Sequence, residues 1–453
     1  REWSNRIGLK RIPQGYFDYP AGSMFWARVE ALAPLFKAGI TLSDFPEEVG
    51  QTDGTLAHVI ERFLVLSSLE QGFQPAIIKD KTNPSWSSWR LDQYINRSYE
   101  LLVELLNKQT IKLIAFDIFD TLILRPLLNP ETIKEIVARK AGNETGDLYR
   151  KFRVIAEDQA RRIKGQDVNL DEIYSQFEKI TNISVEVLSS LKQLEKNIEI
   201  ALAQPRPDAI MLYREALKTR KPVVLISDMF LPRTVIETIL KVCGIQDWYS
   251  IYISGELGIR KDNGDLYKYV MRHFNINPDE MLMIGDNEHS DVQVPCDMGA
   301  NYIHLMRPVE LAKGLPRWSQ IINGFENIQS EEKIDAEIPL ALVLNKNLSS
   351  LSFKNFDFES ITTPDPYSIG YSLVGPLILS FVDWLLEQAK EDNIDHFYFL
   401  AREGRLIKSV YDQWCSERGD TPTSDYMVIN RRSASVAAIT SMEDILNIAR
   451  VEY

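Results

Sequence analysis

The 453-residue sequence has few cysteines, no excess of positive charge and no long uncharged apolar run. Its three cysteines, Cys243, Cys296 and Cys415, form no Cys-x-x-Cys pair, so they indicate neither a disulfide framework nor a zinc site, and they favour a reducing compartment. The net charge of −13 argues against binding of nucleic acid over a broad surface, which needs clustered Lys and Arg. A small anionic substrate is still compatible, because a few local cations can dominate one pocket.

The most apolar stretch runs from Tyr371 to Leu386, and Pro376 and Asp383 interrupt it. A membrane-spanning helix needs about 20 nearly uncharged residues, so we interpret this stretch as a buried helix and expect no integral membrane span. No signal peptide opens the sequence, which begins at Arg1 directly in patterned sequence. We therefore expect a fragment of a longer chain.

The length predicts more than one domain, because a single hydrophobic core rarely grows beyond about 250–300 residues. Composition and patterning divide the chain into residues 1–75, rich in aromatics, Gly and Pro; a linker and helix over 76–108; strands alternating with helices over 109–310; and a C-terminal α/β segment over 320–453, after a polar link near 329–337.

Five apolar runs within residues 109–310 predict β-strands separated by helices such as 232–242 and 266–274. The runs are 112–116, 222–226, 248–253, 281–284 and 301–305. This alternation predicts an α/β fold, a three-layer Rossmann-like core with a parallel sheet covered on both faces. Ligands bind at the carboxyl ends of such strands, so the polar residues found there are expected to share one crevice.

Those polar residues form a set that suits phosphoryl transfer. Asp117 ends the first strand, Ser227 ends the second, Lys261 follows the third, and Asp286 and Asp291 follow the fourth. A carboxylate can attack phosphorus, Mg²⁺ takes oxygen ligands, and a lysine and a hydroxyl neutralise and orient phosphate oxygens. Each residue alone has a structural interpretation as a turn former, a helix cap or a solvated lysine, and only the joint pattern favours chemistry.

With these motifs in register, residues 111–306 resemble the haloacid dehalogenase superfamily of hydrolases. The resemblance implies an aspartyl-phosphate on Asp117. The implied metal ligands are Asp117, the backbone carbonyl of Phe119, Asp286 and Asp291, and the implied phosphoryl contacts are Ser227 and Lys261. Further candidates for substrate contacts are Thr121, Asp228, Asn287 and Arg153. For Asp228 and Asn287, a plain turn role is an equal alternative.

The sequence departs from the phosphatase pattern at Phe119. Phosphatases of this superfamily carry a second Asp there, which acts as general acid and then as base, and such a group contributes about 10²–10⁴-fold. Asp120 could supply the proton if the loop turns it inward, although capping of a helix near Thr121 is the favoured interpretation. The site is then a phosphatase with unusual acid/base chemistry, a phosphatase for good leaving groups or a catalytically weak binder. The D-x-F-D-T-L motif also resembles that of hydrolases fused to polysaccharide-synthesis proteins.

Residues 126–205 lie between the first two motifs and predict helices over 131–140, 147–163 and 171–180. The resemblance makes them a helical cap that selects the substrate and excludes water. Arg153, Glu157 and Arg161 recur on one helix face, where a salt-bridged surface is favoured over a phosphate- or sugar-facing patch.

The N-terminal sequence from Pro20 to Arg28, with the later stretch from Gly50 to Arg62, resembles the C-terminal part of rhamnan synthesis protein F and related surface-glycan proteins. It also resembles the acceptor half of an inverting glycosyltransferase, in which Asp53 would be the general base. The alternative for Asp53 is the N-cap of a helix over 56–66, and His58 is interpreted as a core residue in preference to a metal ligand. Without a nucleotide-binding half, this segment is not expected to transfer sugars on its own.

Near the C-terminus, residues 395–400 and 426–429 predict strands flanking a helix over 406–414. The arginines after the first strand could bind an anion at the helix N-terminus, but packing against the hydrolase region is favoured.

Together these features predict a cytoplasmic Mg²⁺-dependent phosphohydrolase that acts on a phosphorylated sugar or glycan intermediate in bacterial surface-polysaccharide synthesis. Its expected partners are glycosyltransferases or polysaccharide-assembly proteins, with the inner face of the membrane as an expected location. The alternative, which Phe119 favours, is a catalytically weak binding or scaffold module accessory to a glycosyltransferase.

Overall fold

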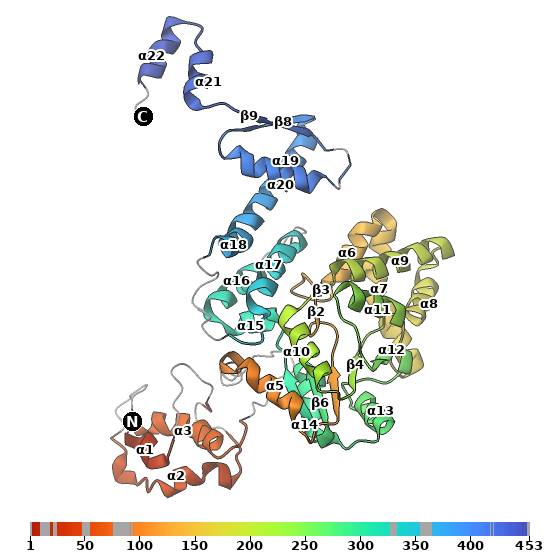
Figure 1. Cartoon of the computed structure of the whole chain (residues 1–453), viewed down its shortest axis with the longest axis vertical. Helices are drawn as coiled ribbons and strands as arrows, with labels where there is room; N and C mark the ends of the chain where they lie inside the picture. The colour runs from red at the N-terminus through yellow and green to blue at the C-terminus, as the bar shows by residue number, and fades with distance from the viewer. Residues whose placement is uncertain are drawn as a thin grey trace. The chain divides into compact units, whose positions relative to one another are not determined.

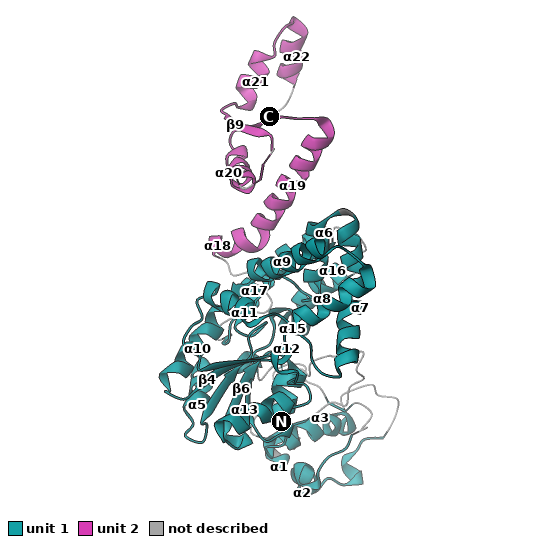
Figure 2. Cartoon of the chain, turned by 90° about the vertical axis from the view of Figure 1, so that its right-hand side faces the viewer, with its two compact units in different colours: residues 1–359 teal, residues 360–453 magenta. Residues whose placement is uncertain are grey.

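A computed structural model describes residues 2–9, 19–20, 25–47, 55–75, 91, 94–326, 333–353, 365–416, 418–419 and 421–450. Contacts within the chain separate residues 1–359 from residues 360–453, and Figure 2 colours these two units differently. Each unit is described by itself.

A five-stranded parallel sheet lies at the centre of the first unit, with the strand order β5-β4-β1-β6-β7. Its strands are β1 (Leu113–Phe116), β4 (Val223–Ser227), β5 (Ser250–Ile253), β6 (Met281–Gly285) and β7 (Asn301–His304). Each matches one predicted apolar run within a few residues, so the predicted α/β fold with a parallel sheet is confirmed.

Helices cover both faces of this sheet (Figure 1). Successive side chains of a strand point to opposite faces, so the apolar strands contribute to two separate cores, one on each face. In β1, Ile114 and Phe116 belong to one core, and Leu113 and Ala115 belong to the other. The first core includes α5 (Tyr99–Asn107), α10 (Pro207–Lys218) and α11 (Arg233–Val242), and the second includes α13 (Asp265–Phe274) and α14 (Val294–Asp297).

A helical insertion occupies the interval where a cap was expected. The chain leaves the core through β2 (Ile123–Leu124) and returns through β3 (Gln204–Pro205), which pair in antiparallel fashion. The inserted helices are α6 (Thr132–Ala141), α7 (Asn143–Lys164), α8 (Leu170–Thr181) and α9 (Val185–Leu202). A capping box fixes the start of α8, since Asn169 and Glu172 each accept the other's backbone N–H.

The first unit continues past residue 310 into a C-terminal extension, which packs on the hydrolase region. It comprises α15 (Pro308–Gly314), α16 (Pro316–Glu326), α17 (Lys333–Leu348) and the segment up to Phe353. The expected polar link near 329–337 is partly the start of α17, where Glu337 is 5% exposed and accepts the backbone N–H groups of Leu128 and Asn129. The boundary between the two contact-defined units lies between residues 359 and 360, and the predicted domain boundaries stay predictions.

The N-terminal helices α1 (Glu2–Ile7), α2 (Ala33–Lys37) and α3 (Leu56–Glu70) share a small core with η2 (Val29–Leu32). The N-cap of α3 is Thr55. Asp53, predicted as a general base or as the cap of this helix, lies outside the described residues. His58 is half-buried, and its Nδ1 lies 2.7 Å from the Thr55 hydroxyl oxygen.

The second unit pairs β8 (His396–Leu400) with β9 (Thr423–Met427) in parallel and packs α19 (Gly375–Asp392) and α20 (Gly404–Cys415) on them. Residues 366–392 are helical and long and apolar enough to cross a membrane, judged by length and composition alone, and 11% of their most apolar window is buried. The expectation of a buried helix was therefore wrong. Only one face of α19, with Val382 and Ala389 buried, contacts its neighbours, whereas Leu377 is 72% exposed.

Candidate active site

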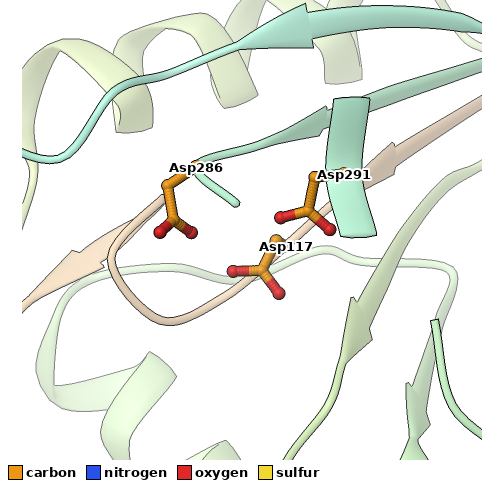
Figure 3. Close-up of side chains that lie close together, drawn as sticks. All are labelled: Asp117, Asp286 and Asp291. Carbon is orange, nitrogen blue, oxygen red and sulfur yellow. The ribbon is translucent and has the colours of Figure 1, made fainter. Parts of the chain in front are cut away.

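Three carboxylates converge at the carboxyl ends of the two central strands (Figure 3). Asp117 follows β1, Asp286 follows β6, and Asp291 lies in the π-helical turn η5 (Glu288–Gln293). Because β1 and β6 are paired neighbours, Asp117 and Asp286 leave the sheet side by side. Carboxylate oxygens of all three residues lie within 4.8 Å of one another, which matches the oxygen donor set of a divalent cation.

Lys261 is the cation of this cluster and is 3% exposed. Its Nζ donates to Asp117 Oδ1 at 2.6 Å and to Asp291 Oδ1 at 2.7 Å. The turn that carries Lys261 is held by Asp228, whose carboxylate oxygens accept the Lys261 backbone N–H at 3.0 and 3.1 Å. The Tyr267 hydroxyl also donates to Asp291 Oδ1, at 3.2 Å. Asp117, the candidate nucleophile, is therefore oriented by a buried lysine that donates two hydrogen bonds within the cluster.

Negative charge exceeds positive charge in this cluster. Burial raises the pKa of Asp117 to about 7, although the Lys261 ammonium opposes the shift. Burial, reinforced by the nearby Asp120 and Asp117 carboxylates, raises the pKa of Asp286 well above its usual range. Burial opposes the charge on Lys261, yet the Asp117 and Asp291 carboxylates raise the pKa of its ammonium. A divalent cation would relieve this repulsion, so Asp117, Asp286 and Asp291 fit Mg²⁺ in chemistry as well as in position.

Gly285 permits the close approach of Asp291 to β6. A Cβ at this position would lie 2.3 Å from Asp291 Oδ2, so any side chain would displace that carboxylate. Asn287 holds the following turn, because its side-chain oxygen accepts the backbone N–H groups of His289 and Ser290 at 3.0 Å. A glycine directly before the acidic turn was visible in the sequence, but its steric role follows only from the structure.

The predicted phosphate and substrate residues lie at or near this cluster, except Arg153, which lies inside the cap. Ser227 ends β4, the other neighbour of β1, and is 2% exposed. The Thr121 hydroxyl donates to Asp286 Oδ1 at 3.0 Å, and His304, which the sequence analysis missed, lies with Nε2 2.7 Å from the Asp286 carbonyl oxygen. Substrate contacts by Ser227, Thr121, Asp228 and Asn287, and metal ligation by the Phe119 carbonyl, stay predictions.

Asp120 does not cap a helix, because the chain after it makes a turn and enters β2. Ile123 N–H bonds back to the Ile118 carbonyl, and Asp120 has a φ of 59°. The Asp120 side chain lies 3.1 Å from Arg125 Nη2 and 3.7 Å from Arg307 Nε. Burial opposes its ionisation, but these two guanidinium groups together hold the pKa of Asp120 below its usual range. Asp120 is therefore an ionised anchor of the loop, and the helix-cap interpretation was wrong.

The favoured i,i+4 ion pairs among Arg153, Glu157 and Arg161 are present, but Arg153 is buried inside the cap, at 1% exposure, and is not part of a surface. It donates to Glu195 on α9 and to Glu157 on its own helix, both at 2.8 Å. Tyr174 on α8 also donates to Glu195, at 2.7 Å. The charged face of α7 was recognised correctly, but at Arg153 it meets Tyr174 of α8 and Glu195 of α9.

Comparison with known proteins agrees with two parts of this description. Residues 111–294 match the family model of haloacid dehalogenase-like hydrolases, and residues 3–73 match that of rhamnan synthesis protein F. Both predicted resemblances are confirmed: the chain contains a haloacid dehalogenase-like hydrolase domain preceded by a rhamnan synthesis protein F-like segment.

Individual relatives each match only a part of the chain. An uncharacterized protein, WxcX, of Xanthomonas campestris pv. campestris strain B100 is 49% identical over 61 residues, which are 14% of this chain and 9% of that protein. A solved L-2-haloacid dehalogenase from Xanthobacter autotrophicus is 15% identical with a TM-score of 0.35, covering 49% of this chain and 86% of that one. A haloacid dehalogenase family enzyme from Bacteroides thetaiotaomicron, solved with magnesium and inorganic phosphate, is 16% identical with a TM-score of 0.34, covering 44% and 95%.

Proposed function

We propose that the haloacid dehalogenase-like hydrolase domain is a Mg²⁺-dependent phosphohydrolase that acts through an aspartyl-phosphate on Asp117. The observation that carries this proposal is the convergence of three carboxylates within 4.8 Å around Asp117, with Lys261 bonded to two of them. A carboxylate that only caps a turn needs neither a buried lysine nor two further acids beside it.

The residues of the site divide the chemistry among them. Mg²⁺, held by Asp117, Asp286 and Asp291, would supply the positive charge that neutralises the phosphoryl oxygens. Lys261 orients the Asp117 carboxylate and opposes the rise in its pKa, so that the other carboxylate oxygen can attack phosphorus. Ser227, at the end of the neighbouring strand, would donate to a phosphoryl oxygen.

The substrate context is supported by the segment that precedes the domain. Because residues 3–73 match rhamnan synthesis protein F, we place the reaction in the cytoplasm, or at the inner face of the membrane, on a phosphorylated sugar or glycan intermediate of surface-polysaccharide synthesis. Glycosyltransferases or polysaccharide-assembly proteins are the partners that this context suggests.

A screen of phosphorylated compounds with purified protein tests the proposal. We expect phosphate release that requires Mg²⁺ and that falls by about a thousandfold or more in Asp117→Asn, since the nucleophile is lost while the side chain keeps its shape. Circular dichroism of the variant controls for folding.

The second candidate function is a binding or scaffold module accessory to a glycosyltransferase, and Phe119 at the general-acid position favours it. It predicts equal, background-level phosphate release from wild type and Asp117→Asn.

A further inference from the structure

The hydrolase site contains no proton donor for a leaving group among the side chains that the structure describes next to Asp117. The ionisable groups bonded to or clustered with Asp117 are Lys261, Asp286 and Asp291, and all three serve the metal and phosphate positions. Phe119 stands two residues after Asp117 and offers a hydrocarbon ring. It lies against a cation, because Arg125 Cζ is 5.1 Å from the ring centroid.

Asp120 cannot swing round to replace the missing acid without breaking several bonds. Its carboxylate is paired with Arg125 and Arg307, and its backbone N–H donates to the Ile123 carbonyl at 2.6 Å. Its own carbonyl accepts from the fully buried Arg206, which also donates to the Leu305 carbonyl. Turning the carboxylate inward would leave Arg125, which is 8% exposed, without one of its two carboxylate partners, and a buried charge that loses a partner is strongly destabilising.

A site of this kind can expel a leaving group only as an anion. A carboxylate oxygen of Asp117 bonds to phosphorus, and the bond to the leaving oxygen breaks with its electron pair on the departing group. A departing phosphate is stable in that form, whereas an alkoxide from a sugar hydroxyl requires a proton during bond cleavage. Water then attacks phosphorus, the bond to Asp117 breaks with its electron pair on the carboxylate, and the water proton passes to solvent.

We infer that the substrates of this site are phosphoanhydrides, in which the terminal phosphoryl group is attached to another phosphate, and not phosphate monoesters of sugar hydroxyls. This inference rests on the proposed function and narrows its substrate class. Diphosphate-linked sugars and nucleoside diphosphates carry such a bond. Arg125 lies beside Phe119 and Asp120, and Arg307 lies beside Asp120. These cations are consistent with a leaving group that departs as an anion near Phe119.

The test compares leaving groups on one enzyme. Full-chain protein with Mg²⁺ is assayed on pyrophosphate and ADP, on glucose 6-phosphate, and on aryl phosphates of graded phenol acidity. We expect kcat/KM for the anhydrides to exceed that for glucose 6-phosphate by about 10²–10⁴-fold, the usual contribution of a general acid. Across the aryl phosphates, kcat/KM should rise steeply as the phenol becomes more acidic. Similar values for anhydride and alkyl ester, or a shallow dependence on acidity, would overturn the inference.

Variants at Phe119 sharpen the assay. Phe119→Asp should raise activity on glucose 6-phosphate and flatten the dependence on phenol acidity, whereas the matched Phe119→Asn should do neither. If Phe119→Asp does not fold, the wild-type series alone decides. Release that is absent for every compound, or that survives Asp117→Asn, defeats the proposed function and this inference with it. Release that depends on Asp117 but ignores the leaving group defeats only the inference.

Discussion

Two clusters of buried charge in the hydrolase domain are built on opposite principles. At the strand ends, Asp117, Asp286 and Asp291 lie together, Lys261 pairs with Asp117 and Asp291 alone, and the pKa values of Asp117 and Asp286 are raised. Inside the cap, the charges around Arg153 are balanced: Arg153 pairs with Glu157 and Glu195, and Glu157 pairs also with Arg161 and Lys134. An excess of one sign marks a place that a ligand ion would complete, whereas a balanced network is complete in the protein alone.

The largest effect is expected from breaking the balanced cluster. Arg153→Met leaves Glu195 and Glu157 without their main cation in a dry interior, so the free energy of unfolding should fall by about 3–5 kcal/mol. Urea denaturation followed by circular dichroism measures this loss. Arg162→Met, on the exposed side of the same helix, is the matched control and should change stability by less than about 0.5 kcal/mol. Equal effects of the two changes would show that the cap network contributes no more than a surface charge.

A smaller effect on the free energy of unfolding, which depends on pH, is expected from the unbalanced cluster of Asp117, Asp286 and Asp291. In metal-free protein the pKa of Asp117 is raised from 3.8 to about 7 by burial, so the folded state holds a proton that the unfolded state has released. Stability from this group is therefore present below about pH 4, lost as the pH rises through 7, and constant above that. Relative to Asp117→Asn, the wild type should lose about 3–4 kcal/mol between pH 4 and pH 8, because each unit of the pKa difference contributes about 1.4 kcal/mol.

Thermal unfolding of both proteins in EDTA measures this difference. Glu199, whose pKa burial also raises to about 7, is common to both proteins and cancels in the comparison. Added Mg²⁺ should stabilise the wild type at pH 8, because the ion binds only the folded state. A wild-type curve parallel to that of Asp117→Asn at every pH would show that the acid cluster carries no electrostatic strain.

The sequence revealed the unbalanced cluster and missed the nature of the balanced one, for a physical reason. Asp117, Lys261 and Asp286 end or follow apolar strands, and parallel pairing brings all strand ends to one edge whatever the side-chain details. Arg153 and Glu157 at i,i+4 look alike on an exposed helix and on a covered one, because only tertiary packing decides what lies opposite.

The surroundings of Asp120 show the same limit. Its partner Arg307 lies far along the chain, and the positive φ that directs the Asp120 side chain leaves no periodic signal. The apolar pattern of α19 likewise predicted a helix correctly, but not that most of its surface is uncovered within its own unit.

A third kind of buried carboxylate refines the comparison and gives the smallest expected effect. Glu337 on α17 has no guanidinium or ammonium among its described bonds; Oε1 accepts the backbone N–H of Leu128 at 2.8 Å, the backbone N–H of Asn129 at 3.0 Å and the Thr132 hydroxyl at 3.1 Å. Glu337→Gln keeps the shape and an acceptor oxygen but loses the charge that strengthens these bonds, so unfolding free energy should fall by about 1 kcal/mol. The matched change Asp335→Asn, two residues earlier on the same helix and on an exposed side chain paired with Arg139, should cost less than about 0.5 kcal/mol in the same urea titration. If Glu337→Gln left the free energy of unfolding unchanged, a carboxylate and an amide would accept equally well from the uncharged donors of Leu128, Asn129 and Thr132. The charge of a buried carboxylate would then matter only where it is paired with a cation.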